Sequence, residues 1–249
     1  MINIKTAREI ELMKNAGRLV GETLKLLESQ IRPGISTLAL DKIAEEFIME
    51  HGAIPSFKNY NGFPGSICAS VNHVVIHGIP SKAVILKEGD IISVDCGALL
   101  QGFHGDAART FRVGQVSEEA DRLIKITEES FFKGLEQAKV GQHLGDISAA
   151  IQKHIESNGF SVVRDFTGHG IGRDLHEAPS IPNYGTALRG PKLRAGMALA
   201  IEPMVNVGLY HVKVLEDNWT TVTRDGKLSA HYENTVIITE DGPLITTLL

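Results

Sequence analysis

The sequence predicts an α+β protein in which two half-sheets lie side by side with helices outside them. The first observation is a repeated order of elements, in which two helices followed by strand-like segments occur twice. The second is spacing, because Gly34 and Gly52 are 18 residues apart, as are Gly141 and Gly159. The third is an offset of 107 residues that aligns apolar positions of the two second helices: Leu40 with Ile147, Ala44 with Ile151, and Ile48 with Ile155. Since many helices of this length end in glycine, chance is the alternative to an internal duplication. We expect one domain, residues 1–249, with halves 1–114 and 115–249.

The first half begins with two predicted helices. Thr6-x-x-Glu9 is a capping box, and apolar residues follow it at helical spacing as far as Pro33-Gly34. Ser36 or Thr37 begins the second helix, which ends at Gly52. Strand-like segments follow at 66–71, 73–77, 90–100 and 103–113.

The second half repeats this order. Ser117 and the acidic residues after it suit the N-terminus of a third helix, which ends before Gly141. A fourth helix ends at Gly159. The strand-like segments of this half are 160–164, 197–206, 211–215 and 229–238.

Composition excludes several classes of protein. The net charge is −5 and the pI is about 6.1, so no global basic field would recruit nucleic acid. No apolar segment approaches the roughly 18 residues that a membrane span requires, and residues 1–5 lack the apolar block of a signal peptide. The two cysteines, Cys68 and Cys96, are too few for a disulfide framework. We therefore expect a cytoplasmic protein.

Asp95 and Asp106 lie on opposite sides of a predicted hairpin around residues 100–102. A turn centred on 100/101 pairs them directly, and one centred on 101/102 makes them diagonal neighbours. Both alternatives put them on one face, roughly 4.5–8 Å apart at Cβ. A bound cation would offset the repulsion and burial of these carboxylates. The alternative is a partly exposed hairpin that tolerates two acids.

Two further acids interrupt apolar segments that are predicted to be strands. Glu202 follows Met197–Ile201, and Glu233 precedes Asn234–Ile238. Each alone could be a salt-bridged strand residue. Four such acids, with no matching run of buried lysine or arginine nearby, favour a metal site.

His169, in a glycine-rich segment read as a loop, supplies a candidate imidazole ligand. A lone histidine in such a loop is more often structural, and the same holds for His77. One imidazole with four carboxylates suits Mn²⁺, Fe²⁺ or Co²⁺ better than structural zinc. Four acids exceed the needs of one catalytic ion, so we expect two divalent ions about 3.5–4 Å apart.

At these residues the chain resembles the type I methionine aminopeptidases of the bacterial kind, members of the pita-bread fold, over essentially its whole length. The motifs that carry the resemblance are His77-Gly-Ile-Pro, Asp95, His104-Gly-Asp106, Thr167-Gly-His169-Gly-Ile-Gly, Leu175-His176-Glu, Ile201-Glu202-Pro-Met204 and Tyr232-Glu233-Asn-Thr235. The resemblance implies two pseudo-symmetric halves with a curved, mainly antiparallel sheet and helices outside.

The resemblance also implies an activity: removal of the initiator methionine from nascent polypeptides when the second residue is small, by attack of a metal-bound water or hydroxide. It implies five metal ligands, namely Asp95, Asp106, His169, Glu202 and Glu233, with Asp106 and Glu233 bridging. Glu202 is also the implied proton shuttle. His77 and His176 are the implied contacts to substrate and its tetrahedral intermediate.

The methionine pocket implied by the resemblance consists of Phe57, Tyr60, Phe63, Cys68, Leu175 and Trp219, any of which could instead be plain core. Two positions depart from the expected pattern. Leu175 stands where phenylalanine is expected, which predicts a roomier pocket. His231 stands where glutamine is expected, two residues before a ligand and on the same strand face, and therefore bears on the surroundings of the second ion.

Three alternatives remain beside this interpretation. Prolidases and proline aminopeptidases resemble this ligand set but carry a sizeable additional N-terminal domain, for which little chain precedes Asp95. Pita-bread binding modules without catalysis typically lack some ligands, and a passive metal-binding protein would not need the pocket. The expected partners are the N-termini of nascent chains, for a monomer. Transient ribosome contact is a further hypothesis, although no zinc-finger extension or basic tail supports it.

Overall fold

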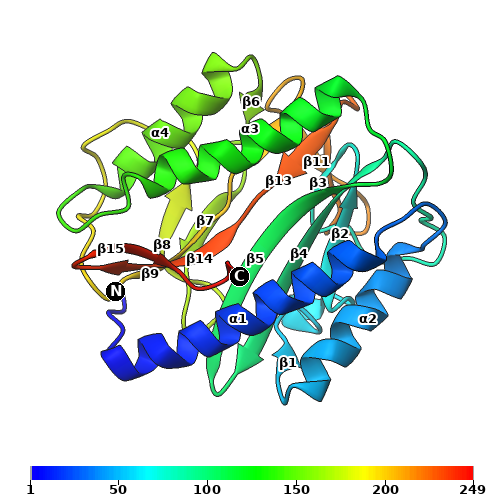
Figure 1. The fold of residues 1–249 in the computed structure, drawn as a ribbon. Coiled ribbons are helices and arrows are strands. Elements are labelled where there is room, and N and C mark those ends of the chain that lie inside the picture. Colours follow the sequence, from blue (N-terminus) through cyan, green and yellow to red (C-terminus); the bar gives the residue numbers. More distant parts are fainter. Residues whose placement is uncertain (1, 249) are drawn as a thin grey trace.

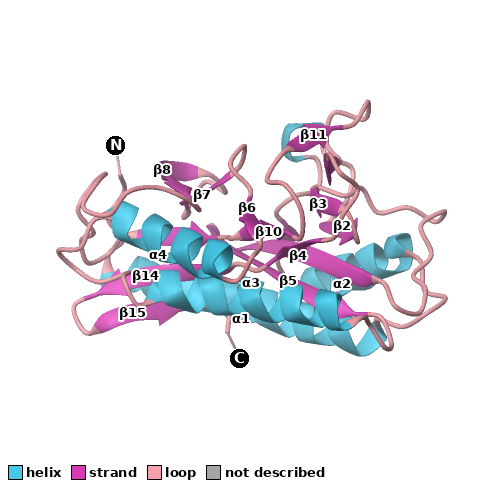
Figure 2. Cartoon of the chain, turned by 90° about the horizontal axis from the view of Figure 1, so that it is seen from above, coloured by secondary structure: helices cyan, strands magenta, loops and turns pink. Residues whose placement is uncertain are grey.

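Four long helices lie along one face of the molecule, and the strands lie behind them (Figures 1 and 2). The computed structural model describes residues 2–248. The helices are α1 (Ala7–Gln30), α2 (Thr37–Glu50), α3 (Glu118–Leu135) and α4 (Leu144–Ser157). Within the described residues, every helix is too short or too polar to cross a lipid bilayer.

Helix α1 begins at the predicted capping box, in which Thr6 and Glu9 bond reciprocally. It packs against β4 and β5 at very short range. A Cβ added to Gly105 of β5 would lie 2.7 Å from the Gly17 nitrogen, and one on Gly17 would lie 2.5 Å from Thr246 Oγ1. Gly105 therefore permits the close approach of α1 to β5, and Gly17 permits the close approach of Thr246 to α1.

The first sheet is built around the predicted hairpin. β4 (Ile91–Leu100) pairs with β5 (Phe103–Arg112), and also with β1 (Ile54–Pro55) and β2 (Ile67–Val71). All these pairs are antiparallel. The short 3-10 turn Tyr60–Gly62 lies between β1 and β2.

The second large sheet has the order β15-β14-β9-β7-β8. Its strands are β15 (Gly242–Ile245), β14 (Asn234–Thr239), β9 (Ala198–Ile201), β7 (Thr167–Gly170) and β8 (Glu177–Pro182). Two three-stranded sheets complete the fold: β13 (Ser229–His231), β10 (Met204–Asn206) and β6 (Ser161–Val162), and then β11 (Val212–Val214), β12 (Thr221–Thr223) and β3 (Val74–Ile76).

Strand β5 meets residues 231–235 along a seam in the middle of the molecule, where Figure 1 shows β5 beside β13. Ala108 and Glu233 exchange main-chain hydrogen bonds of 3.3 and 2.9 Å. On either side a threonine hydroxyl bonds both the N–H and the C=O of the residue opposite. Thr235 does this for Asp106, and Thr110 does it for His231. Two segments that carry predicted ligands are therefore held in one fixed register.

The buried apolar side chains form two main cores. One contains only residues between 19 and 113, and it lies between α1, α2 and the first sheet. The other contains Ile91 together with residues between 120 and 238. This separation agrees with the interpretation of the chain as two halves, although the division at 114/115 stays an interpretation of the sequence.

The helices and the strands β2 to β5 lie where the sequence predicts them. Two segments of the second half were each predicted as one continuous strand, and this is wrong because each forms two strands. Segment 197–206 is divided at Glu202 and Pro203, because proline has no N–H for a strand ladder. Segment 229–238 is divided at Tyr232 and Glu233, because the main chain of Glu233 bonds to Ala108 across the seam.

The reading of the segment around His169 as a loop is also wrong, because it forms strand β7. A Cβ on Gly168 would lie 2.3 Å from the Ala200 oxygen, and one on Gly170 would lie 2.2 Å from the Ala178 oxygen. The glycines therefore permit close approach of neighbouring strands.

Candidate metal centre

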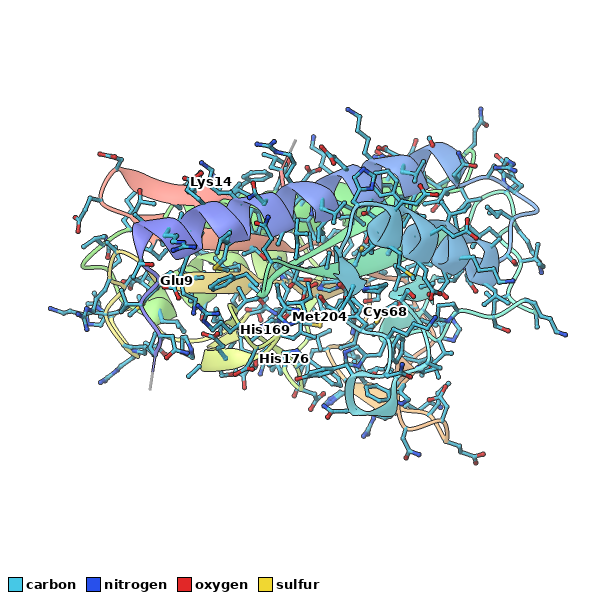
Figure 3. The ribbon with its side chains drawn as sticks, turned by 90° about the horizontal axis from the view of Figure 1, so that it is seen from below. Glu9, Lys14, Cys68, His169, His176 and Met204 are labelled. Atoms are coloured by element: carbon cyan, nitrogen blue, oxygen red, sulfur yellow. The ribbon has the colours of Figure 1, made fainter. Side chains whose placement is uncertain are left out.

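A cavity of about 380 Å³ opens at the seam between the sheets, on the side away from helix α1. The structure brings all thirteen predicted site residues into its lining: Phe57, Tyr60, Phe63, Cys68, His77, Asp95, Asp106, His169, Leu175, His176, Glu202, Trp219 and Glu233. Figure 3 shows His169 beside His176, with Cys68 further along the same side of the molecule.

Asp95 and Asp106 come from the hairpin β4–β5. Asp95 pairs with Ala108, and Asp106 pairs with Gly97, so the two aspartates are diagonal neighbours. Of the two registers considered from the sequence, the one with the turn centred on 101/102 is therefore correct. Glu202 follows β9 directly, and Glu233 lies between β13 and β14. All four acids approach the cavity from different segments.

His169 in β7 presents one ring nitrogen to the acids. Its Nδ1 lies 2.8 Å from the Gly170 carbonyl oxygen, which can only accept a hydrogen bond, so Nδ1 carries the proton. Nε2 then offers its lone pair, 3.9 Å from Asp106 Oδ2 and 3.6 Å from Glu202 Oε1. Asp106, His169 and Glu233 have donor atoms within 4.8 Å of one another, a spacing that can hold a cation.

The surroundings of the four carboxylates strongly raise their pKa values. Burial raises the pKa of Asp95 to about 7 and that of Glu202 to about 8. Burial, followed by the charges of its neighbours, raises the pKa of Asp106 and of Glu233 well above the usual range. Burial lowers the pKa of His169 to about 3, so its imidazole is neutral and able to bind metal.

Three buried oxygens of this cluster have no hydrogen-bond partner among residues 2–248: Asp95 Oδ1, Asp106 Oδ1 and Glu233 Oε1. Such atoms are costly unless a ligand satisfies them. The buried guanidinium of Arg109 is nearby, but it does not donate to these carboxylates. It donates to the Glu233 main-chain oxygen at 2.5 Å and to Asn234 Oδ1 at 2.6 Å. The donor set and its unpaired oxygens therefore fit divalent metal.

His176 and His77 lie at the edge of this cluster. The His176 ring is 4.3 Å from the His169 ring, and its Nδ1 lies 2.7 Å from the Tyr60 hydroxyl. His77 has φ of 58°, a left-handed conformation rare outside glycine, and its ring meets the edge of Trp219. Burial lowers the pKa of His77 to about 4. Both imidazoles face the cavity without belonging to the clusters with metal-binding spacing.

The apolar side of the cavity is a separate small cluster. Phe57, Phe63, Cys68 and Leu175 pack together and are buried. Tyr60, Trp219 and Ile79 pack against them, and the Trp219 ring meets Phe63 edge-on at 5.1 Å. All six predicted pocket residues thus belong to one apolar cluster, which lines the same cavity as the acids.

Sequence reasoning missed Asn61 in the cavity lining and Ile79 in the apolar cluster. Ile79 was present in the His77-Gly-Ile-Pro motif, so its position beside His77 was a usable signal. Asn61 lies in the short 3-10 turn with φ of 49°, and nothing in the sequence distinguishes it. His231 forms a second cluster of metal-binding spacing with Glu202 and Glu233, which was not predicted.

Comparisons with known proteins agree with this geometry. The model of metallopeptidase family M24 matches residues 11–240. A methionine aminopeptidase of Clostridium perfringens is 64% identical over 249 residues, which cover 100% of both chains. The crystal structure of methionine aminopeptidase from Rickettsia prowazekii has a TM-score of 0.98 at 45% identity and covers 100% of both chains.

A more distant structure, the Xaa-Pro dipeptidase from Bacillus anthracis, has a TM-score of 0.79 at 26% identity. The alignment covers 98% of this chain but only 61% of that one. The neighbouring structures are methionine aminopeptidases and prolidases of the pita-bread fold, as expected from the sequence. The family match and the full-length relatives show that this chain belongs to metallopeptidase family M24, among its metal-dependent methionine aminopeptidases.

Proposed function

We propose that this aminopeptidase removes the initiator methionine from nascent polypeptides whose second residue is small, using two divalent ions. The observation that carries the proposal is one cavity with two unlike sides. Four carboxylates and an imidazole form one side, and an apolar cluster closed by aromatic rings forms the other. A thioether side chain suits the second side, because aromatic faces and sulfur attract it.

Asp95, Asp106, His169, Glu202 and Glu233 are the proposed ligands, with Asp106 and Glu233 bridging. The unpaired oxygens of Asp95, Asp106 and Glu233 support this assignment. When bound, such ions lower the pKa of a water molecule and polarise a carbonyl group. Co²⁺, Mn²⁺ and Fe²⁺ fit a set rich in carboxylates.

Glu202 is the proposed proton shuttle. Its carboxylate lines the cavity beside the His169 and His231 imidazoles, where it can accept a proton and return it. His176, held through Nδ1 by the Tyr60 hydroxyl, would present its other nitrogen to the substrate. His77 would do so from the Trp219 side of the cavity.

The peptide bond must reach the acids while the methionine side chain fills the apolar cluster. This arrangement restricts the space for the second residue. We therefore expect cleavage of Met-Gly, Met-Ala and Met-Ser peptides and little cleavage of Met-Lys or Met-Phe peptides, measured with defined added metals. Equal turnover of all five contradicts the proposed specificity. Release of residues that precede proline favours the activity of the prolidase relatives.

The proposal extends to the oligomeric state, the cellular location and the contact with the ribosome. A monomer in the cytoplasm would meet nascent chains as they emerge, with only transient contact to the ribosome. Gel filtration tests the monomer, and cosedimentation with ribosomes at low and high salt tests the contact.

A further inference from the structure

His231 has a fixed position beside the proposed ligands. It ends β13, where it pairs with Met204 of β10. Its N–H donates to Thr110 Oγ1 at 2.9 Å, and its C=O accepts from the same hydroxyl at 2.9 Å. The residue is 1% exposed. The imidazole is therefore held inside the protein by a main chain that cannot easily move.

The ring nitrogen Nε2 of His231 lacks a partner. It is buried, and no residue of the described chain 2–248 accepts or donates a hydrogen bond at this atom. Its neighbour Glu202 Oε2 lies 3.6 Å away, which is too long for a good hydrogen bond. An unsatisfied buried polar atom costs about 1–3 kcal/mol, so the atom requires an explanation.

The spacing of this atom matches that of a metal ligand. Two donors that each bind one ion at about 2.1 Å cannot lie more than about 4.2 Å apart. His231, Glu202 and Glu233 each offer one donor atom, and these atoms lie within 4.8 Å of one another. The 3.6 Å between His231 Nε2 and Glu202 Oε2 is already inside the limit.

Glu202 lies between two imidazoles. Its Oε1 is 3.6 Å from His169 Nε2, and its Oε2 is 3.6 Å from His231 Nε2. The two clusters of metal-binding spacing, one containing each histidine, share Glu233. Among the five proposed ligands, the only imidazole is that of His169, which faces Glu202 Oε1. His231 places a second imidazole at the other oxygen, Glu202 Oε2.

We propose that His231 Nε2 is a sixth protein donor, which binds an ion together with Glu202 and Glu233. This inference rests on the proposed dinuclear site. Replacement of an oxygen donor or water by an imidazole nitrogen favours Co²⁺, Ni²⁺ and Zn²⁺ over Mn²⁺. The second ion should therefore show a stronger preference for Co²⁺ over Mn²⁺ than a site with carboxylates alone.

The decisive experiment counts imidazoles on the metal. Wild type, His231→Gln and His169→Gln are loaded with two equivalents of Co²⁺, and bound cobalt is measured by elemental analysis. X-ray absorption at the cobalt edge then gives the number of imidazole ligands from their outer-shell scattering. Because the spectrum averages over all bound cobalt, the count is multiplied by the measured cobalt content to give imidazoles per chain. We expect two imidazoles per chain for wild type and one for each variant. Glutamine can donate a hydrogen bond to Glu202 without supplying an imidazole, so this variant separates ligation from simple positioning.

A count of one imidazole per chain in wild type, unchanged in His231→Gln and lost in His169→Gln, overturns the proposal. Competition with a chelator provides a second readout, in which His231→Gln should reduce the Co²⁺ over Mn²⁺ preference of the second ion, whereas loss of a positioning residue would weaken the binding of both metals alike. An unchanged preference also counts against ligation. Failure of the dinuclear site would appear separately, as one bound cobalt per chain, and the imidazole count on that ion still decides the role of His231.

Discussion

Replacement of Glu202 by glutamine in the chelated protein tests the electrostatics of the carboxylate cluster. Burial raises the pKa of Glu202 from 4.5 to about 8 in the folded chain. Between these two pH values, Glu202 therefore keeps its proton in the folded state and has lost it in the unfolded state. The contribution of Glu202 to stability is complete below pH 4.5 and is lost as pH rises through 8.

Buried histidines act in the opposite direction but at lower pH. Burial lowers the pKa of His77, His104 and His231 to about 4 and that of His169 to about 3. They destabilise the folded state only as pH falls below 6.5 towards these values. Between pH 6.5 and 8 the pH dependence of stability that arises from this cavity therefore comes almost entirely from its carboxylates.

The size of the effect follows from the pKa of Glu202. Each proton held only by the folded state changes stability by 1.36 kcal/mol per pH unit. With a folded pKa of about 8, Glu202 alone should remove on the order of 1–2 kcal/mol of stability between pH 6.5 and 8. Asp95, with a pKa of about 7, adds a smaller loss of the same sign.

The assay is urea unfolding in excess chelator from pH 6.5 to 8 at constant ionic strength. Glu202→Gln should reduce the decline in the free energy of unfolding by on the order of 1–2 kcal/mol over this range. Glu136→Gln is the matched control, because Glu136 is fully exposed and its pKa is lowered by Lys133. Parallel pH profiles for wild type and Glu202→Gln would refute the reasoning.

Four further predictions follow from the site and the seam. Mn²⁺ or Co²⁺ at a hundredfold excess over Kd should stabilise wild type by about 2.7 kcal/mol in thermal melts, and Asp106→Asn should lose most of this response. His176→Ala should lower kcat about 10²-fold or more while metal content by elemental analysis stays unchanged. Thr235→Val leaves the N–H and C=O of Asp106 without a partner, so urea unfolding should show a loss of about 2–4 kcal/mol. Leu175→Phe should narrow the pocket and lower cleavage of ethionine peptides relative to methionine peptides, and an unchanged ratio would contradict a roomier pocket.

The elements that could be predicted from sequence are those with local signals. The capping box at Thr6 and the hairpin of β4 and β5 depend on residues close together in the chain, and both are confirmed. The break at Glu233 could not be predicted, because its cause is Ala108, far away in sequence. Strand β7 was hidden by its glycines, which resemble a loop until the neighbouring strands are known.

More of the candidate site than of the exact strand boundaries could be predicted from the sequence. Acids such as Asp95 and Glu202 stand out in apolar segments, and their convergence follows from the motifs that carry the family resemblance. The location of His231 was noted, but its unpaired nitrogen and its distance from Glu202 are properties of tertiary structure alone.

The seam between β5 and residues 231–235 has a consequence for how the protein folds. Its threonine bonds join residues 121 to 129 positions apart, whereas the two main cores draw almost entirely on one side of the chain each. Contacts of such long sequence separation form slowly, since a large loop must close first. We expect each half to collapse around its own helices before the halves dock. Metal uptake during refolding should therefore lag behind the recovery of helical circular dichroism, and bound cobalt would report the docking step itself.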